Sequence, residues 1–234
     1  MAPTAKSGTR PVRAPTPKRG PTAELERAAG AETGATVFGV DEVGRGPLAG
    51  PVVTGAAWID VARMPTAVAG LIADSKVLSA DRRASALAAA EPYAVIALGR
   101  AEVAEIDATN ILAAALTAMG RAVEALVAAL GRSPDLVLVD GNRLPKWSWP
   151  AEAVVKGDSR SISIALAAIA AKQARDAEMT ELSRLHPGYG WERNAGYGTA
   201  AHKAALAALG PTPHHRRSFA PVRAALAAGA DGLR

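Results

Sequence analysis

Cysteine is absent from the 234-residue chain. Without thiols the protein can form neither disulfide bonds nor thiolate metal sites, and a reducing compartment is the simplest setting. The chain also shows no stretch approaching the ~20 apolar residues of a membrane-spanning helix, and no apolar core of the signal-peptide kind near its N-terminus. These absences predict a cytoplasmic protein that has no membrane partner.

The body of the chain lacks an excess of charge, although the formal net charge is +5, from 27 basic and 22 acidic residues. Five basic residues precede the first acid, Glu24, so the remaining 22 basic residues balance the 22 acids. Residues 1–35 are rich in Pro, Thr, Gly and Ala and show no hydrophobic periodicity. We therefore predict a disordered basic tail over 1–35, with at most weak attraction to phosphates, and a flexible C-terminus over 224–234.

Between these tails, short β-branched runs alternate with helical patterns. The expected strands are Thr36–Asp41, Val52–Trp58, Tyr93–Leu98, Leu136–Val139 and Ala153–Lys156. The expected helices are a Ser79-capped segment to Ala90, Asn110–Leu130, a segment from Ile162 to about Leu185, Thr199–Leu209 and a short helix after Pro221. Short links favour antiparallel pairing of the early strands, and long helices favour parallel pairing of the later ones. The pattern predicts an α/β fold: a mixed sheet flanked by helices.

Three of these strands end in an acid beside glycine. If the ends converge, four carboxylates share one site, and their repulsion requires either protonation or bound divalent cations. An all-oxygen ligand set favours Mg²⁺ or Mn²⁺ over zinc, and paired ions of this kind suit phosphodiester hydrolysis. Taken singly, an acid at a strand end is more often a cap or turn former than a metal ligand. The four acids are Asp41, Glu42, Asp140 and Asp158.

Several longer motifs follow one another between Val37 and Val222, and together they closely resemble the type 2 ribonuclease H family in its bacterial form, ribonuclease HII. They are GVDEVGRGPLAGPVV, DSKVLS, NILAAALTAMGRAVEAL, LVLVDGNRLP, VVKGDSRSISIALAAIAAKQARD, HPGYGWERNAGYGTAAH and GPTPHHRRSF.

The resemblance implies a ribonuclease H-like fold: a five-stranded mixed sheet within a catalytic domain over 36–223, with a C-terminal helical part from about residue 187. It implies an endonuclease that uses Mn²⁺ or Mg²⁺, with the four acids as catalytic and metal-binding residues. We expect the protein to be a monomer. The implied substrates are RNA–DNA hybrids and duplex DNA that contains single ribonucleotides.

The resemblance also implies how the ribose is read. Gly44, Arg45 and Gly46 match a loop that recognises the 2′-hydroxyl largely through its backbone, and Tyr197 matches a tyrosine that contacts the sugar at the junction. For Tyr197 a packed aromatic side chain is the alternative. Four basic residues are candidate phosphate contacts, with a solvated surface as the alternative: Lys76, Lys156, Arg160 and Arg216.

Three other classes share part of this pattern. Type 3 ribonucleases H have the same fold but differ at the Gly-Arg-Gly loop and usually end the quartet in Glu. Resolvase or transposase cores would share the acids but lack the Gly-Arg-Gly and Gly-Tyr-Gly segments. A non-catalytic hybrid-binding protein would not require the intact quartet.

Overall fold

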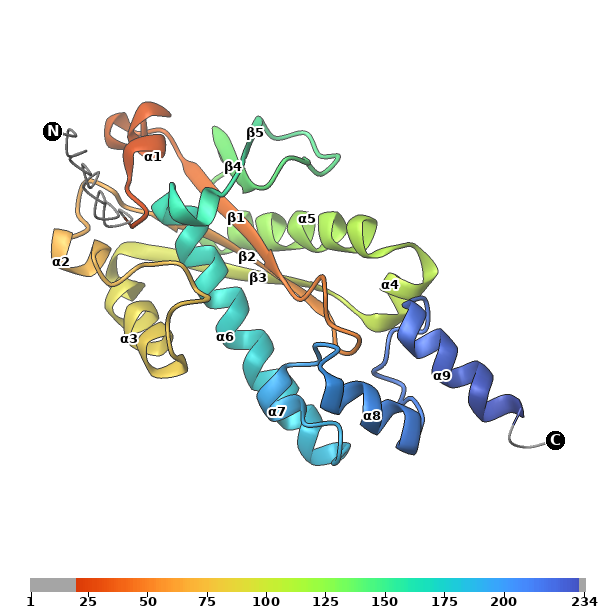
Figure 1. The fold of residues 1–234 in the computed structure, drawn as a ribbon. Coiled ribbons are helices and arrows are strands. Elements are labelled where there is room, and N and C mark those ends of the chain that lie inside the picture. The colour runs from red at the N-terminus through yellow and green to blue at the C-terminus, as the bar shows by residue number, and fades with distance from the viewer. Residues whose placement is uncertain (1–19, 232–234) are drawn as a thin grey trace, which may run out of the picture.

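A mixed five-stranded sheet forms the centre of the molecule in a computed structural model that describes residues 20–231 (Figure 1). The strand order is β3-β2-β1-β4-β5. β1 pairs antiparallel with β2, and β2 pairs antiparallel with β3, whereas β1–β4 and β4–β5 are parallel. This confirms the predicted mixture. The strands are β1 (Val37–Val43), β2 (Val52–Ile59), β3 (Ala94–Ala101), β4 (Leu136–Asp140) and β5 (Ala151–Val154).

Helix α5 (Ile111–Leu130) covers one face of the sheet. Asn110 caps its N-terminus by accepting the Ala113 N–H at 2.9 Å, and Gly131 ends it with a positive φ of 70°. By length and composition α5 could cross a membrane, so the prediction that no segment qualifies is wrong. In the structure its apolar side packs on the sheet, which explains the composition without a membrane.

Helix α6 (Ile162–Leu185) covers the opposite face and lies almost in contact with the strand backbones. Gly39 of β1 faces the backbone of Ser163 and Ile164, and Gly55 of β2 faces the carbonyl of Ala167. A Cβ atom at either glycine would overlap the helix backbone. Glycine is therefore required where α6 crosses the sheet.

The remaining helices lie around this core, and α7, α8 and α9 gather beyond the C-terminal half of α6 (Figure 1). They are α1 (Glu24–Ala28), α2 (Thr66–Ala69), α3 (Ala80–Ala90), α4 (Val103–Ala108), α7 (Trp191–Asn194), α8 (Ala200–Leu209) and α9 (Ala220–Asp231), with short 3₁₀ turns at Ala31–Thr33, Glu91–Tyr93 and Gly157–Ser159.

Both ends of the described chain differ from the prediction. Residues 20–35 are structured, because α1 inserts Glu26 into the fold, where it accepts the hydroxyl protons of Ser161 and Ser163, each at 2.6 Å. At the other end, α9 continues to Asp231 instead of giving way to a flexible segment at 224. The rest of the predicted basic tail, residues 1–19, lies outside the described residues.

Candidate active site

The acids Asp41 and Glu42 lie inside β1, which continues to Val43 and does not end at Asp41 as predicted. Within the strand, Asp41 lies opposite Gly55 and Glu42 opposite Thr54, so their side chains leave opposite faces. Asp41 is buried, and its Oδ1 accepts the Glu42 N–H at 2.7 Å. The pairing of β1 with β4 stops at Val40 and Val139, so both acids lie beyond the part of β1 that pairs with β4.

Asp140 and Asp158 come from the neighbouring part of the sheet. Asp140 is the last residue of β4, adjacent to β1 and β5. Its Oδ1 accepts the Gly157 N–H at 2.6 Å, which draws the turn that carries Asp158 toward it. Asp158 is buried, and its Oδ2 bonds the Lys76 ammonium at 3.1 Å.

Burial and the charges of neighbouring acids raise the pKa values of three of the four acids. Burial raises the pKa of Asp41 well above its usual range, and the charges of Asp140, Glu42 and Asp158 add to the effect. Burial also raises the pKa of Glu42, against the opposing influence of Arg45, and that of Asp140. The structure thus brings the predicted quartet into electrostatic contact without enough positive charge to balance it.

The donor set fits a divalent cation in its chemistry. One oxygen of Glu42, Oε2, is buried without a hydrogen-bond partner, while Oε1 bonds Arg45 at 3.1 Å. Within residues 20–231, no three acidic or histidine side chains already enclose a point that could hold an ion. Their oxygens are instead turned toward Arg45, Lys76 and the amide of Gly157. Because Lys76 and Arg45 are largely exposed, their side chains can move away at low cost.

A pocket of about 380 Å³ lies beside the acids and collects most of the predicted substrate residues. It is lined by Glu42, Val43, Gly44, Arg45, Gly46, Ser75, Lys76, Lys172 and Tyr197. A larger hollow of about 580 Å³ lies beneath α1 and α2 and contains none of the predicted residues. The smaller pocket, which we call the loop pocket, is therefore the candidate substrate site.

The loop pocket places Tyr197 directly against Gly46. A Cβ atom at Gly46 would lie 3.4 Å from the Cε1 atom of Tyr197, and the Tyr197 side chain is 47% exposed. An aromatic ring that served only packing would be more fully buried. Its exposure beside the loop favours contact with a ligand.

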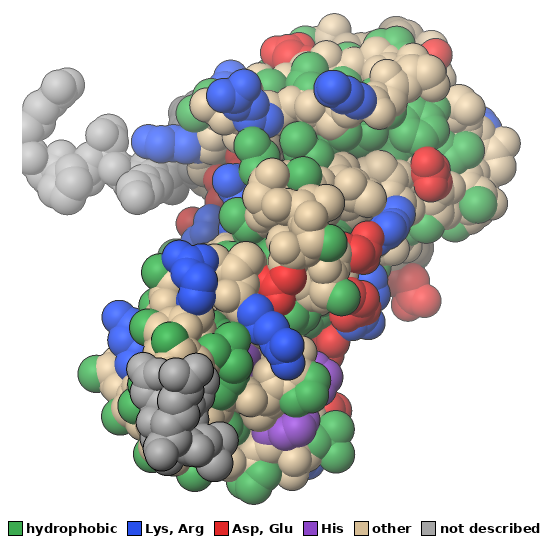
Figure 2. Space-filling view, turned by 90° about the vertical axis from the view of Figure 1, so that its right-hand side faces the viewer, with side chains coloured by type: hydrophobic (Ala, Val, Ile, Leu, Met, Phe, Trp, Pro, Cys, Tyr) green, Lys and Arg blue, Asp and Glu red, His purple; other side chains and the backbone are tan. Residues whose placement is uncertain are grey.

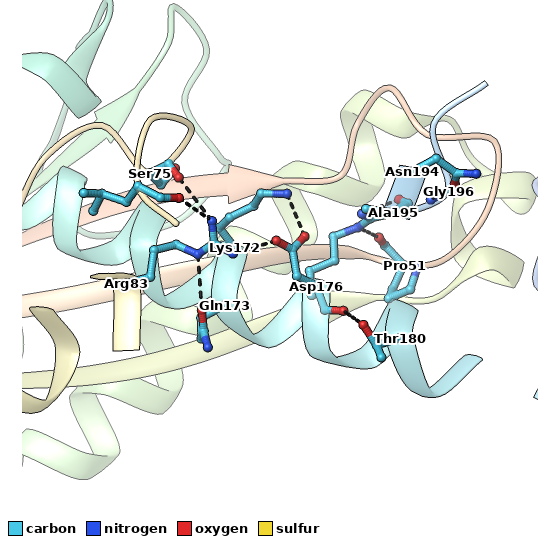
Figure 3. Close-up of polar contacts among 12 residues, drawn as sticks. Pro51, Ser75, Arg83, Lys172, Gln173, Asp176, Thr180, Asn194, Ala195 and Gly196 are labelled. Carbon is cyan, nitrogen blue, oxygen red and sulfur yellow. Dashed lines mark hydrogen bonds and ion pairs between the residues drawn. The ribbon is translucent and has the colours of Figure 1, made fainter. Parts of the chain in front are cut away.

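Two polar pocket residues, Lys172 and Ser75, were not predicted from sequence. Lys172 of α6 bonds Asp176 at 2.6 Å, and Asp176 also bonds the buried Arg83 at 2.8 Å (Figure 3). Arg83 in turn bonds the carbonyl oxygens of Ser75 and Leu78. This chain of contacts attaches the loop that carries Lys76 to α6, and only the tertiary structure reveals it.

The four predicted basic residues differ in exposure and in their distance from the acids. Lys156 and Arg160 are exposed on the turn that carries Asp158, and Lys76 reaches that acid directly. Arg216 is fully buried, all its hydrogen bonds go to backbone carbonyls, and its guanidinium lies over the Phe219 ring at 5.2 Å from the centroid. The prediction that Arg216 contacts phosphate is therefore wrong in this structure, because the residue lies beneath the Gly44–Gly46 loop.

On the face in Figure 2, basic and acidic side chains are interspersed.

A buried network of neutral histidines supports the backbone of Tyr197. His202 bonds the Tyr197 carbonyl through Nδ1 at 2.9 Å, and its Nε2 accepts the Trp191 indole N–H at 3.1 Å. His215 Nε2 lies 3.1 Å from the same His202 atom, and its Nδ1 accepts the Thr212 N–H at 3.0 Å. These contacts fit one neutral tautomer for each ring: Nδ1–H in His202 and Nε2–H in His215.

Folding stability is expected to decrease as the pH falls from 6.5 toward 4 because of this network. Burial, helped by the neighbouring histidines, lowers the pKa of His215 from 6.5 to about 4. In that interval the unfolded chain takes up a proton that the folded chain excludes, so protons favour unfolding by about 3 kcal/mol at the acid limit. Urea unfolding across this range should show a shallower pH dependence for His215→Gln than for the unaltered protein. Identical slopes would contradict the assignment, since the acids contribute equally to both proteins.

Comparisons with known proteins agree with the geometry. A sequence model described as Ribonuclease HII matches residues 38–222. The Ribonuclease HII of Rhodospirillum rubrum is 57% identical over 213 residues, covering 90% of this chain and 94% of its own. That of Paramagnetospirillum magneticum is 53% identical over 191 residues, covering 82% and 93%.

Solved structures share the fold. The ribonuclease H2 of Pyrococcus horikoshii OT3 superposes with a TM-score of 0.66 at 25% identity, covering 81% of this chain and 96% of its own. Bst-RNase HIII in complex with Mn²⁺ gives a TM-score of 0.65 at 21% identity, covering 83% and 70%. The sheet order, the acids at its centre and the match across most of the chain lead to one assignment: this chain belongs to the ribonuclease HII family, whose members cleave the RNA of RNA–DNA hybrids.

Proposed function

We propose that this chain is a metal-dependent endonuclease that also incises duplex DNA on the 5′ side of a single embedded ribonucleotide. The observation that carries the proposal is the continuity of β1 with the loop pocket. Gly44 and Gly46 come two and four residues after Glu42, and Tyr197 lies against Gly46. The acids proposed for hydrolysis therefore lie next to the surface proposed to recognise the sugar.

The metal ligands in this proposal are the four acids, Asp41, Glu42, Asp140 and Asp158. When bound, Mg²⁺ or Mn²⁺ would activate the attacking water and stabilise the leaving 3′-oxygen, so that the product keeps a 5′-phosphate. The Mn²⁺ found with Bst-RNase HIII and the all-carboxylate donor set both support this choice of ions. Lys76 and Arg45 hold two of the acids before substrate arrives and are free to bind phosphate afterwards.

The remaining residues orient the nucleic acid. The Gly44–Gly46 backbone and the Tyr197 side chain contact the ribose, whose 2′-hydroxyl distinguishes RNA from DNA. Lys156 and Arg160 are exposed beside Asp158, where a phosphate of the same strand can reach them. We further propose a cytoplasmic monomer, which the packing of the apolar helix α5 against the sheet and the lack of cysteine support.

A duplex DNA with one ribonucleotide tests this function directly. In the presence of Mg²⁺ or Mn²⁺ we expect one incision 5′ of the ribonucleotide, giving 3′-hydroxyl and 5′-phosphate ends, and none after chelation with EDTA. A hybrid with a continuous RNA tract serves as the comparison substrate. Cleavage of the tract without incision at the single ribonucleotide would indicate type 3 behaviour, and binding without cleavage of either would indicate a hybrid-binding protein.

A further inference from the structure

Two arginines are completely buried beneath the loop that joins β1 to β2. Arg175 of α6 and Arg216, in the turn before α9, are each 0% exposed. Within residues 20–231 neither forms an ion pair with a carboxylate: the ion pairs found there all involve other residues. Burial, with a contribution from Arg175, lowers the pKa of Arg216 to about 9, so the side chain remains charged at neutral pH. Burying two unpaired cations is costly, so their partners require an explanation.

The hydrogen-bond partners of Arg216 are five backbone carbonyls of one loop, and its guanidinium also lies over the Phe219 ring. Nε donates to Gly50 O at 2.9 Å, and the two terminal nitrogens donate to the carbonyl oxygens of Gly44, Arg45, Pro47 and Pro51 at 2.6 to 3.2 Å. A guanidinium has five N–H groups, and five acceptors surround this one. Arg216 therefore shapes the loop from within and has no free donor for substrate.

Arg175 connects the same loop to the segment that carries Tyr197, and Figure 3 labels Pro51 and Ala195, which lie at the two ends of this connection. It donates to Pro51 O at 3.0 Å, to Ala49 O at 3.0 Å and to Ala195 O at 2.9 Å. The two segments also meet directly, because Leu48 donates its N–H to Gly196 O at 2.8 Å. One guanidinium thus fixes both halves of the ribose-reading surface relative to each other.

The carbonyl contacts determine which way the amides face. A trans peptide points its C=O and the following N–H in opposite directions. With the Gly44 and Arg45 carbonyls turned inward to Arg216, the N–H groups of Arg45 and Gly46 turn toward the loop pocket. In the described part of the chain, neither amide donates to another backbone group. Gly44 makes this possible, since its φ of 99° and its contact with the Arg175 side chain exclude a Cβ atom.

We propose that Arg175 and Arg216 are positioning residues for ribose discrimination: they hold the loop carbonyls inward so that the amides of Arg45 and Gly46, and the ring of Tyr197, meet the sugar together. This rests on the proposed function and adds two residues that do not touch the substrate. Lysine at either position keeps the charge but offers three donors from one point and cannot span the same carbonyls.

The test compares binding of two duplexes that differ by one hydroxyl group. Fluorescence anisotropy without divalent metal measures Kd for a DNA duplex with a single ribonucleotide and for the same duplex entirely of DNA. If the unaltered protein shows no preference and no incision, the proposed function itself fails. With the preference established, Arg175→Lys and Arg216→Lys are expected to bring the Kd ratio close to 1 while Kd for the all-DNA duplex stays the same. They should also lower kcat/KM on the single-ribonucleotide duplex by about 10²-fold.

A destabilised control separates positioning from general loss of stability. Leu126→Ala removes a fully buried side chain on the α5 side of the sheet, remote from the loop, and should lower Tm while leaving the Kd ratio unchanged. Folded lysine variants that keep the original Kd ratio would overturn the proposal, and so would an equal loss of the ratio in Leu126→Ala. If the lysine variants do not fold, Gly44→Ala disturbs the same contact from the loop side, and an unchanged ratio there would overturn it too.

Discussion

Asp41→Asn and Asp140→Asn are each expected to abolish incision, with a loss of kcat of about 10³-fold or more. This corresponds to about 4 kcal/mol of transition-state stabilisation. Each substitution removes a negative charge from the quartet while preserving the size of the side chain. The expected cause is weaker binding and poorer placement of the divalent cations that the four acids are proposed to share. Single-turnover cleavage of the single-ribonucleotide duplex at saturating Mn²⁺ measures the effect.

The same Asp41→Asn change should leave stability equal or higher. An asparagine Oδ1 can still accept the Glu42 N–H that Asp41 accepts at 2.7 Å. Burial and the neighbouring acids raise the pKa of Asp41, which means that the ionised carboxylate opposes folding at neutral pH. Removing the charge therefore relieves repulsion, so Tm in the absence of metal should not fall.

Asp135→Asn provides the matched control. Asp135 accepts the Thr36 N–H at 2.7 Å at the start of β4 and is not one of the four acids. Its replacement should leave kcat near that of the unaltered protein. Full activity of Asp41→Asn, or equal losses in Asp41→Asn and Asp135→Asn, would contradict the assignment of the quartet.

Gly55→Ala is expected to destabilise the fold by ~3 kcal/mol. The new Cβ would lie 2.8 Å from the carbonyl carbon of Ala167 and closer still to its oxygen. Both contacts involve backbone in the N-terminal part of α6, so no flexible side chain can move aside. Relief requires α6 to shift away from β1 and β2. Thermal or urea unfolding monitored by circular dichroism measures the loss.

Replacement of Gly120 by alanine should instead increase the stability of the fold. Gly120 lies in α5, and a Cβ atom there would meet nothing within 4 Å. Alanine has the higher helix propensity, so Gly120→Ala should stabilise the protein by about 0.5 to 1 kcal/mol. A loss at Gly120 comparable to that at Gly55 would indicate that the packing of α6 is not what forbids a side chain at Gly55.

Local pattern was sufficient to predict most of the architecture. The strands and long helices carry strong periodicity, and the antiparallel and parallel pairings follow from the lengths of their connections. The α1 segment was missed because five residues beside a Pro-rich stretch carry little periodicity. Its order comes from Glu26 bonding to Ser161 and Ser163, more than 130 positions away. The quartet was predictable because its acids lie near the ends of apolar strand patterns: Asp41 and Glu42 come just before the end of β1, Asp140 ends β4 and Asp158 follows β5.

The arginines were not predictable on the same basis. Arg216 sits in a run of two histidines and two arginines, a composition typical of a solvated basic surface. Arg175 occurs in the charged second half of α6 and has no sequence feature that distinguishes it from its neighbours. Both are buried because distant carbonyls of the β1–β2 loop surround them. Such partners are set by tertiary structure and leave no local signal.

The short stretch of backbone from Asp41 to Gly46 fixes the distance between the acids and the Gly44–Gly46 loop. It is strand up to Val43 and then a turn that the buried arginines fix, so its length cannot vary with the substrate. In the proposed function, this rigid span sets the offset between the sugar that is inspected and the bond that is cut. An insertion within it would shift the register of cleavage along the strand, and sugar selectivity and cut position would change together.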